Sequence, residues 1–176
     1  MNKREHILHT TAQMIMEHGV SRLSLAKVAN QAGVSKGGLL HYFKTKDELF
    51  YQLNVLAIEE FNSEFERLIK VNPDEKGKYI KAYAQATLND LESSNGSVNS
   101  SFVASFTDSP EIMELWKGAY LEWQQKCKED DLDWKDVAAI RFVCDGLWFN
   151  NLLNINDILP YSKELLQNLI DNLEKE

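Results

Sequence analysis

A stretch of 26 residues, Ser24–Leu49, constrains the fold of this chain more than any other segment. Its sequence, SLAKVANQAGVSKGGLLHYFKTKDEL, predicts two short helices joined by a tight turn and followed at once by the start of a third. Ser24 and Ser35 are suitable N-caps, because a serine hydroxyl accepts a hydrogen bond from a free amide of the first helical turn. Gly33 separates the two helices, at a place where a residue with positive φ ends a helix.

Apolar side chains recur at helical spacing in both short helices, so each helix has one face for a core. The second helix is expected to turn Leu39, Leu40 and Phe43 inward. It leaves basic, aromatic and glycine residues outside: Lys36, Gly37, Gly38, His41 and Tyr42. This pattern is typical of a helix-turn-helix unit, whose second helix enters the DNA major groove. A plain helical hairpin with a glycine turn has the same spacing, but the basic and aromatic residues favour DNA binding.

The same residues resemble the N-terminal DNA-binding domain of TetR-family transcriptional regulators. The resemblance is specific over residues 3–53, and its matching segments are residues 24–29, 33–37, 39–43 and 46–49. It implies an all-α chain, in which a three-helix head is joined by a long helix to a helical body that binds a ligand and dimerises. Leu40 departs from the family pattern, which often has tyrosine at that position.

Charge is divided unevenly between the two predicted domains, a DNA-binding head over residues 1–52 and a ligand-binding and dimerisation body over residues 53–176. The whole chain carries a net charge of −8, which is unusual for a protein that binds nucleic acid. Residues 1–52 hold seven Lys or Arg and four Asp or Glu, a net charge of +3, so the remainder carries −11. This asymmetry favours a head that meets nucleic acid, although acidic bodies are also common in soluble proteins.

Hydrophobic periodicity predicts helices along the whole chain and no strand. A first helix over residues 3–18 completes the head, and a long helix from residue 46 to about residue 70 connects the head with the body. The other predicted helices of the body cover residues 78–92, 102–106, 110–128, 134–153 and 161–174.

Eight residues of the head are candidate DNA contacts: Ser24, Ser35, Lys36, Gly37, His41, Tyr42, Thr45 and Lys46. Lys36 can reach a guanine edge or a phosphate from the start of the recognition helix. Lys46 lies at the N-terminus of the long helix, where free amides already favour an anion. Tyr42 and Lys46 also match positions that contact phosphate in TetR-family proteins. For the three hydroxyl residues, helix capping alone is a sufficient explanation.

A single head would bind DNA weakly, so we expect a homodimer on a palindromic operator with half-sites about one helical turn apart. The last two helices, within residues 134–174, are the predicted dimer interface. The helix over residues 134–153 is apolar around most of its circumference, which indicates burial on more than one side. TetR relatives dimerise through the corresponding helices, so the pattern and the resemblance agree.

Aromatic residues of the body are candidates for lining a ligand pocket: Tyr83, Phe102, Phe106, Met113, Trp116, Tyr120 and Trp148. A filled aromatic core would have the same periodicity. The resemblance to ligand-responsive repressors favours a pocket for a small hydrophobic or amphipathic molecule. Four acidic residues would make such a pocket favour a cation, but surface or interface positions are the preferred interpretation for them: Asp90, Asp108, Glu114 and Asp145.

The sequence lacks the patterns of an enzyme, a metal site or a membrane protein. Cys127 and Cys144 have no redox or metal-ligand spacing, and no apolar run approaches the roughly 18 residues of a membrane helix. The first residues lack the apolar core of a signal peptide. We therefore expect a cytoplasmic transcriptional regulator without cofactor or metal. Two alternatives remain: a DNA-binding protein of the same fold whose body binds a protein partner, and an enzyme or carrier with a vestigial head.

Overall fold

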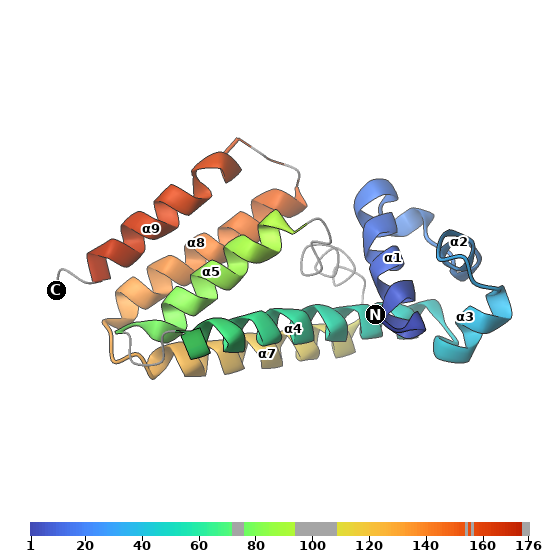
Figure 1. The fold of residues 1–176 in the computed structure, drawn as a ribbon, viewed down its shortest axis with the longest axis horizontal. Coiled ribbons are helices and arrows are strands. Elements are labelled where there is room, and N and C mark those ends of the chain that lie inside the picture. The colour runs from blue at the N-terminus through green and yellow to red at the C-terminus, as the bar shows by residue number, and fades with distance from the viewer. Residues whose placement is uncertain (72–75, 94–108, 154, 156, 174–176) are drawn as a thin grey trace. The chain divides into compact units, whose positions relative to one another are not determined.

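A computed structural model describes residues 1–71, 76–93, 109–153, 155 and 157–173 of the chain (Figure 1). Every regular element among these residues is a helix, as predicted. None of the helices in this part of the chain is long and apolar enough to cross a membrane. The helix predicted over residues 102–106 lies outside the described residues.

Two compact units make up the chain, Met1–Glu59 with Ser94–Leu115 and Glu60–Ser93 with Trp116–Glu176. The longest helix, α4 (Lys46–Val71), begins in the first unit and continues into the second. It agrees with the long helix that the sequence predicts from residue 46 to about residue 70.

The first unit begins with α1 (Lys3–His18), the 3-10 turn η1 (Val20–Arg22), α2 (Leu25–Gln31) and α3 (Lys36–Tyr42). Helix α1 packs on α2, and α2 packs on α3 (Figure 1). The core of this unit includes side chains that are at most 3% exposed, among them Ile7, Leu8, Val28, Ala29, Leu39, Phe43, Leu49 and Leu53. The predicted three-helix head is confirmed, and η1 is an element that the sequence did not predict.

Serine caps and a glycine turn fix the two short helices of the first unit. Ser24 Oγ accepts a hydrogen bond from Lys27 N at 3.3 Å, and Ser35 Oγ accepts one from Gly38 N at 3.0 Å, as predicted. Gly33 lies between the helices with φ of +65°, a conformation that glycine adopts without strain. The turn and its caps hold α3 at a defined angle to α2.

The start of α4 is capped from two directions. Thr45 Oγ1 accepts a hydrogen bond from Glu48 N at 3.0 Å, as a capping box requires. The Glu48 carboxylate accepts a hydrogen bond from Lys44 N at 2.8 Å, so the reciprocal bond reaches one residue upstream of the box. These bonds fix the chain between α3 and α4.

The second unit contains the rest of α4, the later part of α7 (Pro110–Lys128) and four further elements: α5 (Lys78–Glu92), α8 (Trp134–Leu152), η2 (Leu159–Tyr161) and α9 (Ser162–Leu173). Helix α5 packs on α8, and both contact α9. Helices α4 and α7 lie side by side (Figure 1), since Phe61 and Trp123 have ring centroids 4.6 Å apart. This arrangement buries several aromatic side chains, which are at most 2% exposed: Phe65, Tyr83, Trp123 and Trp148.

A carboxylate about 50 residues away caps the start of α5. Gly77 precedes this helix with φ of +71° and has no side chain to serve as a cap. Asp130, which follows α7, accepts hydrogen bonds from Tyr79 N at 3.0 Å and Ile80 N at 2.8 Å. Burial raises the pKa of the Asp130 carboxyl, and the two amide bonds oppose that shift. A tertiary contact therefore satisfies amides that a local cap would otherwise satisfy.

Candidate functional site

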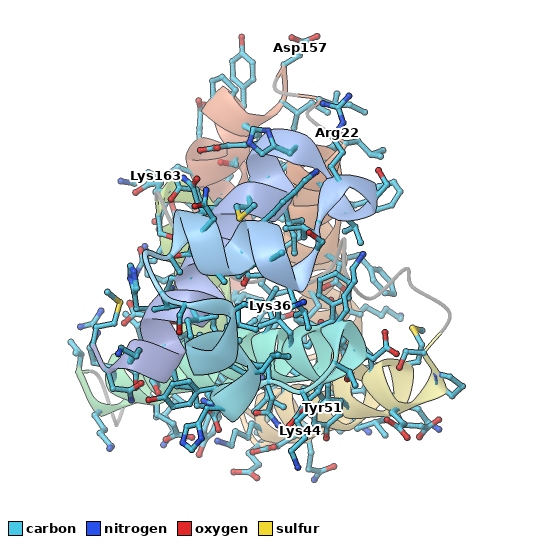
Figure 2. The ribbon with its side chains drawn as sticks, turned by 90° about the vertical axis from the view of Figure 1, so that its right-hand side faces the viewer. Arg22, Lys36, Lys44, Tyr51, Asp157 and Lys163 are labelled. Carbon is cyan, nitrogen blue, oxygen red and sulfur yellow. The ribbon has the colours of Figure 1, made fainter. Side chains whose placement is uncertain are left out.

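Helix α3 has one buried face and one exposed face, as the sequence predicts. Leu39 and Phe43 are fully buried. Lys36, Gly37 and His41 are exposed, and Figure 2 shows the Lys36 side chain at the start of this helix. The exposed set combines a cation, an aromatic ring with hydrogen-bonding nitrogens, and a glycine that lets another backbone approach closely.

The aromatic end of α3 is held by its neighbours. The half-buried Tyr42 ring contacts His41 at a centroid distance of 5.3 Å and Phe43 at 6.4 Å. The Arg4 guanidinium carbon lies 5.9 Å from the Phe43 centroid, and Arg4 Nη2 donates a hydrogen bond to Gln52 Oε1. These contacts tie the first turn of α1 and the first turns of α4 to the recognition helix, which keeps the candidate DNA contacts in a fixed orientation.

Lys46 has both a structural contact and capacity for a ligand. Its half-buried Nζ donates a hydrogen bond to Val20 O at 3.3 Å and lies 5.0 Å from the centroid of the Phe50 ring. An ammonium group has three donor hydrogens, so this bond leaves capacity for a phosphate near the N-terminus of α4. The three candidate hydroxyl groups are exposed and accept cap bonds, and their O–H hydrogens can still be donated: Ser24, Ser35 and Thr45.

Two exposed basic residues near Ser24 were not singled out by the sequence analysis. Arg22 and Lys27 line a surface groove of about 360 Å³. Lys27 Nζ donates a hydrogen bond to Arg22 O at 2.9 Å, so the two residues are held together. The other lining residues are Met14, His18, Leu23, Asn30 and Gln31. The positive charge of residues 1–52 was the signal in the sequence that could have pointed to this pair.

The second unit holds a cluster of seven rings in mutual contact, here called the aromatic cluster: Phe61, Phe65, Tyr83, Trp116, Tyr120, Trp123 and Trp148. Four of the seven predicted ligand residues belong to it: Tyr83, Trp116, Tyr120 and Trp148. Met113 is 58% exposed and lies outside this cluster. Phe102 and Phe106 lie outside the described residues. Helix α4 contributes Phe61 and Phe65, which the sequence analysis did not include.

Acidic side chains accept hydrogen bonds from polar groups of the aromatic cluster. Asp145 Oδ1 accepts hydrogen bonds from the Tyr83 hydroxyl at 3.3 Å and the Tyr120 hydroxyl at 3.2 Å. Asp90 Oδ2 accepts one from Trp148 Nε1 at 3.1 Å. Asp90 and Asp145 are half-buried and serve as hydrogen-bond partners of the cluster, whereas the sequence analysis preferred surface or interface charges for them. Burial, with the nearby Asp145 charge, raises the pKa of Tyr120.

Arg141 of α8 is a buried cation beside the aromatic cluster. It is 6% exposed, and its guanidinium carbon lies 4.9 Å from the Tyr83 centroid and 5.6 Å from the Tyr120 centroid. The sequence analysis did not single it out. The signal that could have found it is a lone arginine between Ile140 and Phe142, in a helix that is otherwise apolar around most of its circumference.

The outer sides of α8 and α9 expose large apolar side chains. On α8 the exposed fractions are 75% for Phe142 and 50% for Phe149, which lie on one helical face, and Leu153 at the C-cap of this helix is 53% exposed. On α9 and the turn before it, Tyr161 is 65% and Leu165 is 41% exposed. The opposite side of α8 is buried, so this helix is apolar on both sides, as its sequence indicates.

Two family models match the chain. The model described as "Bacterial regulatory proteins, tetR family" matches residues 7–53, which contain the helix-turn-helix. The model described as "Tetracyclin repressor-like, C-terminal domain" matches residues 77–175. The second match alone covers more than half of the chain.

Curated relatives match a shorter part of the chain. "Nucleoid occlusion factor SlmA" of Shewanella baltica is 38% identical over 76 residues, which cover 43% of this chain and 37% of the relative. "HTH-type transcriptional repressor NemR" of Escherichia coli K12 is 32% identical over 90 residues, which cover 49% of this chain and 43% of the relative. In both cases the matched part is less than half of the relative's length.

Solved structures resemble the fold over nearly the whole chain. A transcriptional regulator from Rhodococcus sp. Rha1 has a TM-score of 0.77 at 18% identity, covering 98% of this chain and 94% of that one. Multidrug binding protein EbrR, in complex with malachite green, has a TM-score of 0.64 at 20% identity, covering 96% and 98%. At these identities the likeness shows the fold alone.

The fold, the division of α3 into a buried and an exposed face, and the two family models agree with one another. Members of the matched family are DNA-binding regulators and not enzymes, in agreement with the sequence prediction. This chain belongs to the TetR family of helix-turn-helix transcriptional regulators.

Proposed function

We propose that this TetR-family regulator is a repressor that binds a palindromic operator as a homodimer. The observation that carries the proposal is the exposed face of α3, where Lys36 and His41 stand on a helix fixed by caps and by the buried Leu39 and Phe43. Residues of this helix would read base edges, while Lys46, Ser24 and the other caps would hold phosphates. A protein that acts on the chromosome in this way works in the cytoplasm.

The proposed dimer uses the outer sides of α8 and α9, within residues 134–174. Exposed apolar side chains at regular helical spacing indicate a protein interface, because large contiguous apolar patches are rare on monomers. Phe142 and Phe149 of one protomer would pack on the same helices of its partner in a two-fold arrangement. Two heads would then meet two half-sites on the operator, which raises both affinity and specificity.

The proposed effector is a small hydrophobic or amphipathic molecule that binds at the aromatic cluster. Large apolar rings with a few polar groups are typical of ligand sites, and EbrR, a structural neighbour, is described as a multidrug binding protein. The rings contact one another, so the ligand would have to separate them. Since α4 carries both Phe61 of the cluster and Lys46 of the head, a displacement of Phe61 would act on the helix that leads to the DNA contacts.

The coupling free energy between ligand binding and DNA binding must be large enough to release the operator. A ligand shifts the protein only if it prefers the conformation that does not bind DNA. A hundredfold loss of operator affinity requires about 2.7 kcal/mol of coupling free energy.

A second candidate function is a regulator of the same fold whose body binds a protein partner in place of a small molecule. It is favoured by the close ring packing of the aromatic cluster, for example the centroid distances of 4.6 Å between Phe61 and Trp123 and 5.2 Å between Tyr120 and Trp123. In that case the rings form a filled core and no small molecule enters it.

Selection of bound sequences from random DNA with the purified full chain tests the proposal. The expected result is an enriched palindrome bound by two chains, and its release by at least one class in a panel of apolar acids, cations and neutral compounds. A palindrome that no compound releases would support the protein-partner function. Failure to enrich any sequence would contradict specific DNA binding at an operator.

A further inference from the structure

The buried Arg141 side chain has an unused hydrogen-bond donor. Its Nη1 atom is enclosed by the protein and has no hydrogen-bond partner among the described residues. Buried polar groups in folded proteins nearly always have partners, so an orphaned donor on a charged group requires an explanation. The guanidinium lies against the rings of Tyr83 and Tyr120. The face of an aromatic ring has no lone pair that could accept a hydrogen bond from Nη1.

Two acidic side chains of this unit accept hydrogen bonds from ring donors of the aromatic cluster. Asp145 lies one helical turn further along α8, and its Oδ1 atom accepts hydrogen bonds from two tyrosine hydroxyl groups. Asp90 accepts a hydrogen bond from Trp148 Nε1. The Asp145 charge interacts with Arg141, but Nη1 of Arg141 still lacks a hydrogen-bond acceptor among the described residues. A cationic ligand would not supply such an acceptor, whereas an anionic one would.

We propose that Arg141 binds the carboxylate of an apolar or aromatic acid, which is the effector of this regulator. The proposal rests on the proposed ligand response and specifies its chemistry. A planar guanidinium matches a carboxylate with two parallel hydrogen bonds. The apolar body of the acid would lie among the rings of the aromatic cluster. Tyr120 and Asp145 are only half-buried, so the cluster reaches the surface beside Arg141.

The test uses matched compounds that differ only in the head group. One series is 2-naphthoate, 2-naphthalenemethanol and 2-naphthylmethylammonium, and the other is decanoate, decanol and decylammonium. Binding of each compound to the full chain is measured by isothermal titration calorimetry in the absence of DNA. In at least one series the acid is expected to bind about tenfold or more tightly than its alcohol, and the ammonium compound is expected to bind most weakly.

Two substitutions give opposite expectations. Arg141→Met keeps the length of the side chain and removes the charge, so the preference for the acid over the alcohol should disappear. Asp145→Asn keeps an acceptor for the tyrosine hydroxyl groups and removes the negative charge beside Arg141. It should therefore increase the preference for the acid over the alcohol several-fold, about the effect of removing one nearby like charge. If Arg141→Met does not fold, the head-group series and Asp145→Asn still decide the question.

Three results would overturn the proposal: tighter binding of the ammonium compounds than of the acids, equal binding across head groups, or no binding of any acid. A parallel measurement of operator release separates this proposal from the proposed function. An acid that binds through Arg141 but does not release DNA would contradict the ligand response alone. Release by a cation or a neutral compound would leave the ligand response in place and contradict the role of Arg141.

Discussion

Lys46→Met removes one positive charge from each head and keeps most of the side-chain packing on Phe50. If Lys46 neutralises one phosphate, the slope of log affinity against log salt concentration should become less negative by about 0.9 per head, or about 1.8 for a dimer. When salt is raised from 50 to 200 mM, the operator affinity of the Lys46→Met variant should therefore fall by a factor about twelvefold smaller than that of the unsubstituted chain. The ranking of operator sequences should stay the same, because a phosphate contact does not read bases.

The assay is a titration of labelled operator by fluorescence anisotropy at several salt concentrations. Lys70→Met is the matched control, because this exposed lysine lies at the other end of the same helix. The Lys46 ammonium also bonds Val20 O, so a melting curve must show that the variant remains folded. An unchanged salt slope in a folded Lys46→Met variant would refute the assignment of this residue to a phosphate.

Asp130→Ala removes the acceptor of two amides of α5 and should lower the free energy of unfolding by about 1–2 kcal/mol. The melting temperature should fall by about 2–8 °C, and Asp157→Ala, at an exposed position, should show no such fall. Phe142→Asp should convert the dimer to a monomer in sedimentation, and an unchanged dimer would place the interface elsewhere. Burial raises the pKa of both Cys127 and Cys144 to about 12, so neither thiol should react with iodoacetamide at about pH 8 while the chain is folded. Mass spectrometry measures the labelling, and alkylation of either cysteine in the folded chain would contradict this prediction.

Local patterns were sufficient for the main helices and for the buried face of α3. The sequence predicted α1 over residues 3–18 and α5 over residues 78–92, and both agree with the structure. Ser24 and Ser35 were predicted as caps for the same reason, since a cap and its amide are only three residues apart. Helical periodicity also identified Leu39 and Phe43 as buried. The exposed face of α3 is then the side opposite these two residues.

The composition of the aromatic cluster could be predicted only in part. The sequence identified Tyr83 and Trp148 as members, because aromatic residues at helical spacing belong to a core or a pocket. Periodicity alone does not distinguish these two cases. It also gave no reason to include Phe61 of α4, since membership depends on how helices distant in the sequence pack together.

The sequence by itself determined the main helices, the caps of α2, α3 and α4, and the exposed face of α3, because these properties depend on residues within a few positions of one another. Only the tertiary structure decided that Asp130 caps α5 and that Arg141 is buried against Tyr83 and Tyr120. Each of these contacts joins residues that lie at least 20 positions apart in the chain. Their partners are set by the packing of whole helices, which local propensity does not specify.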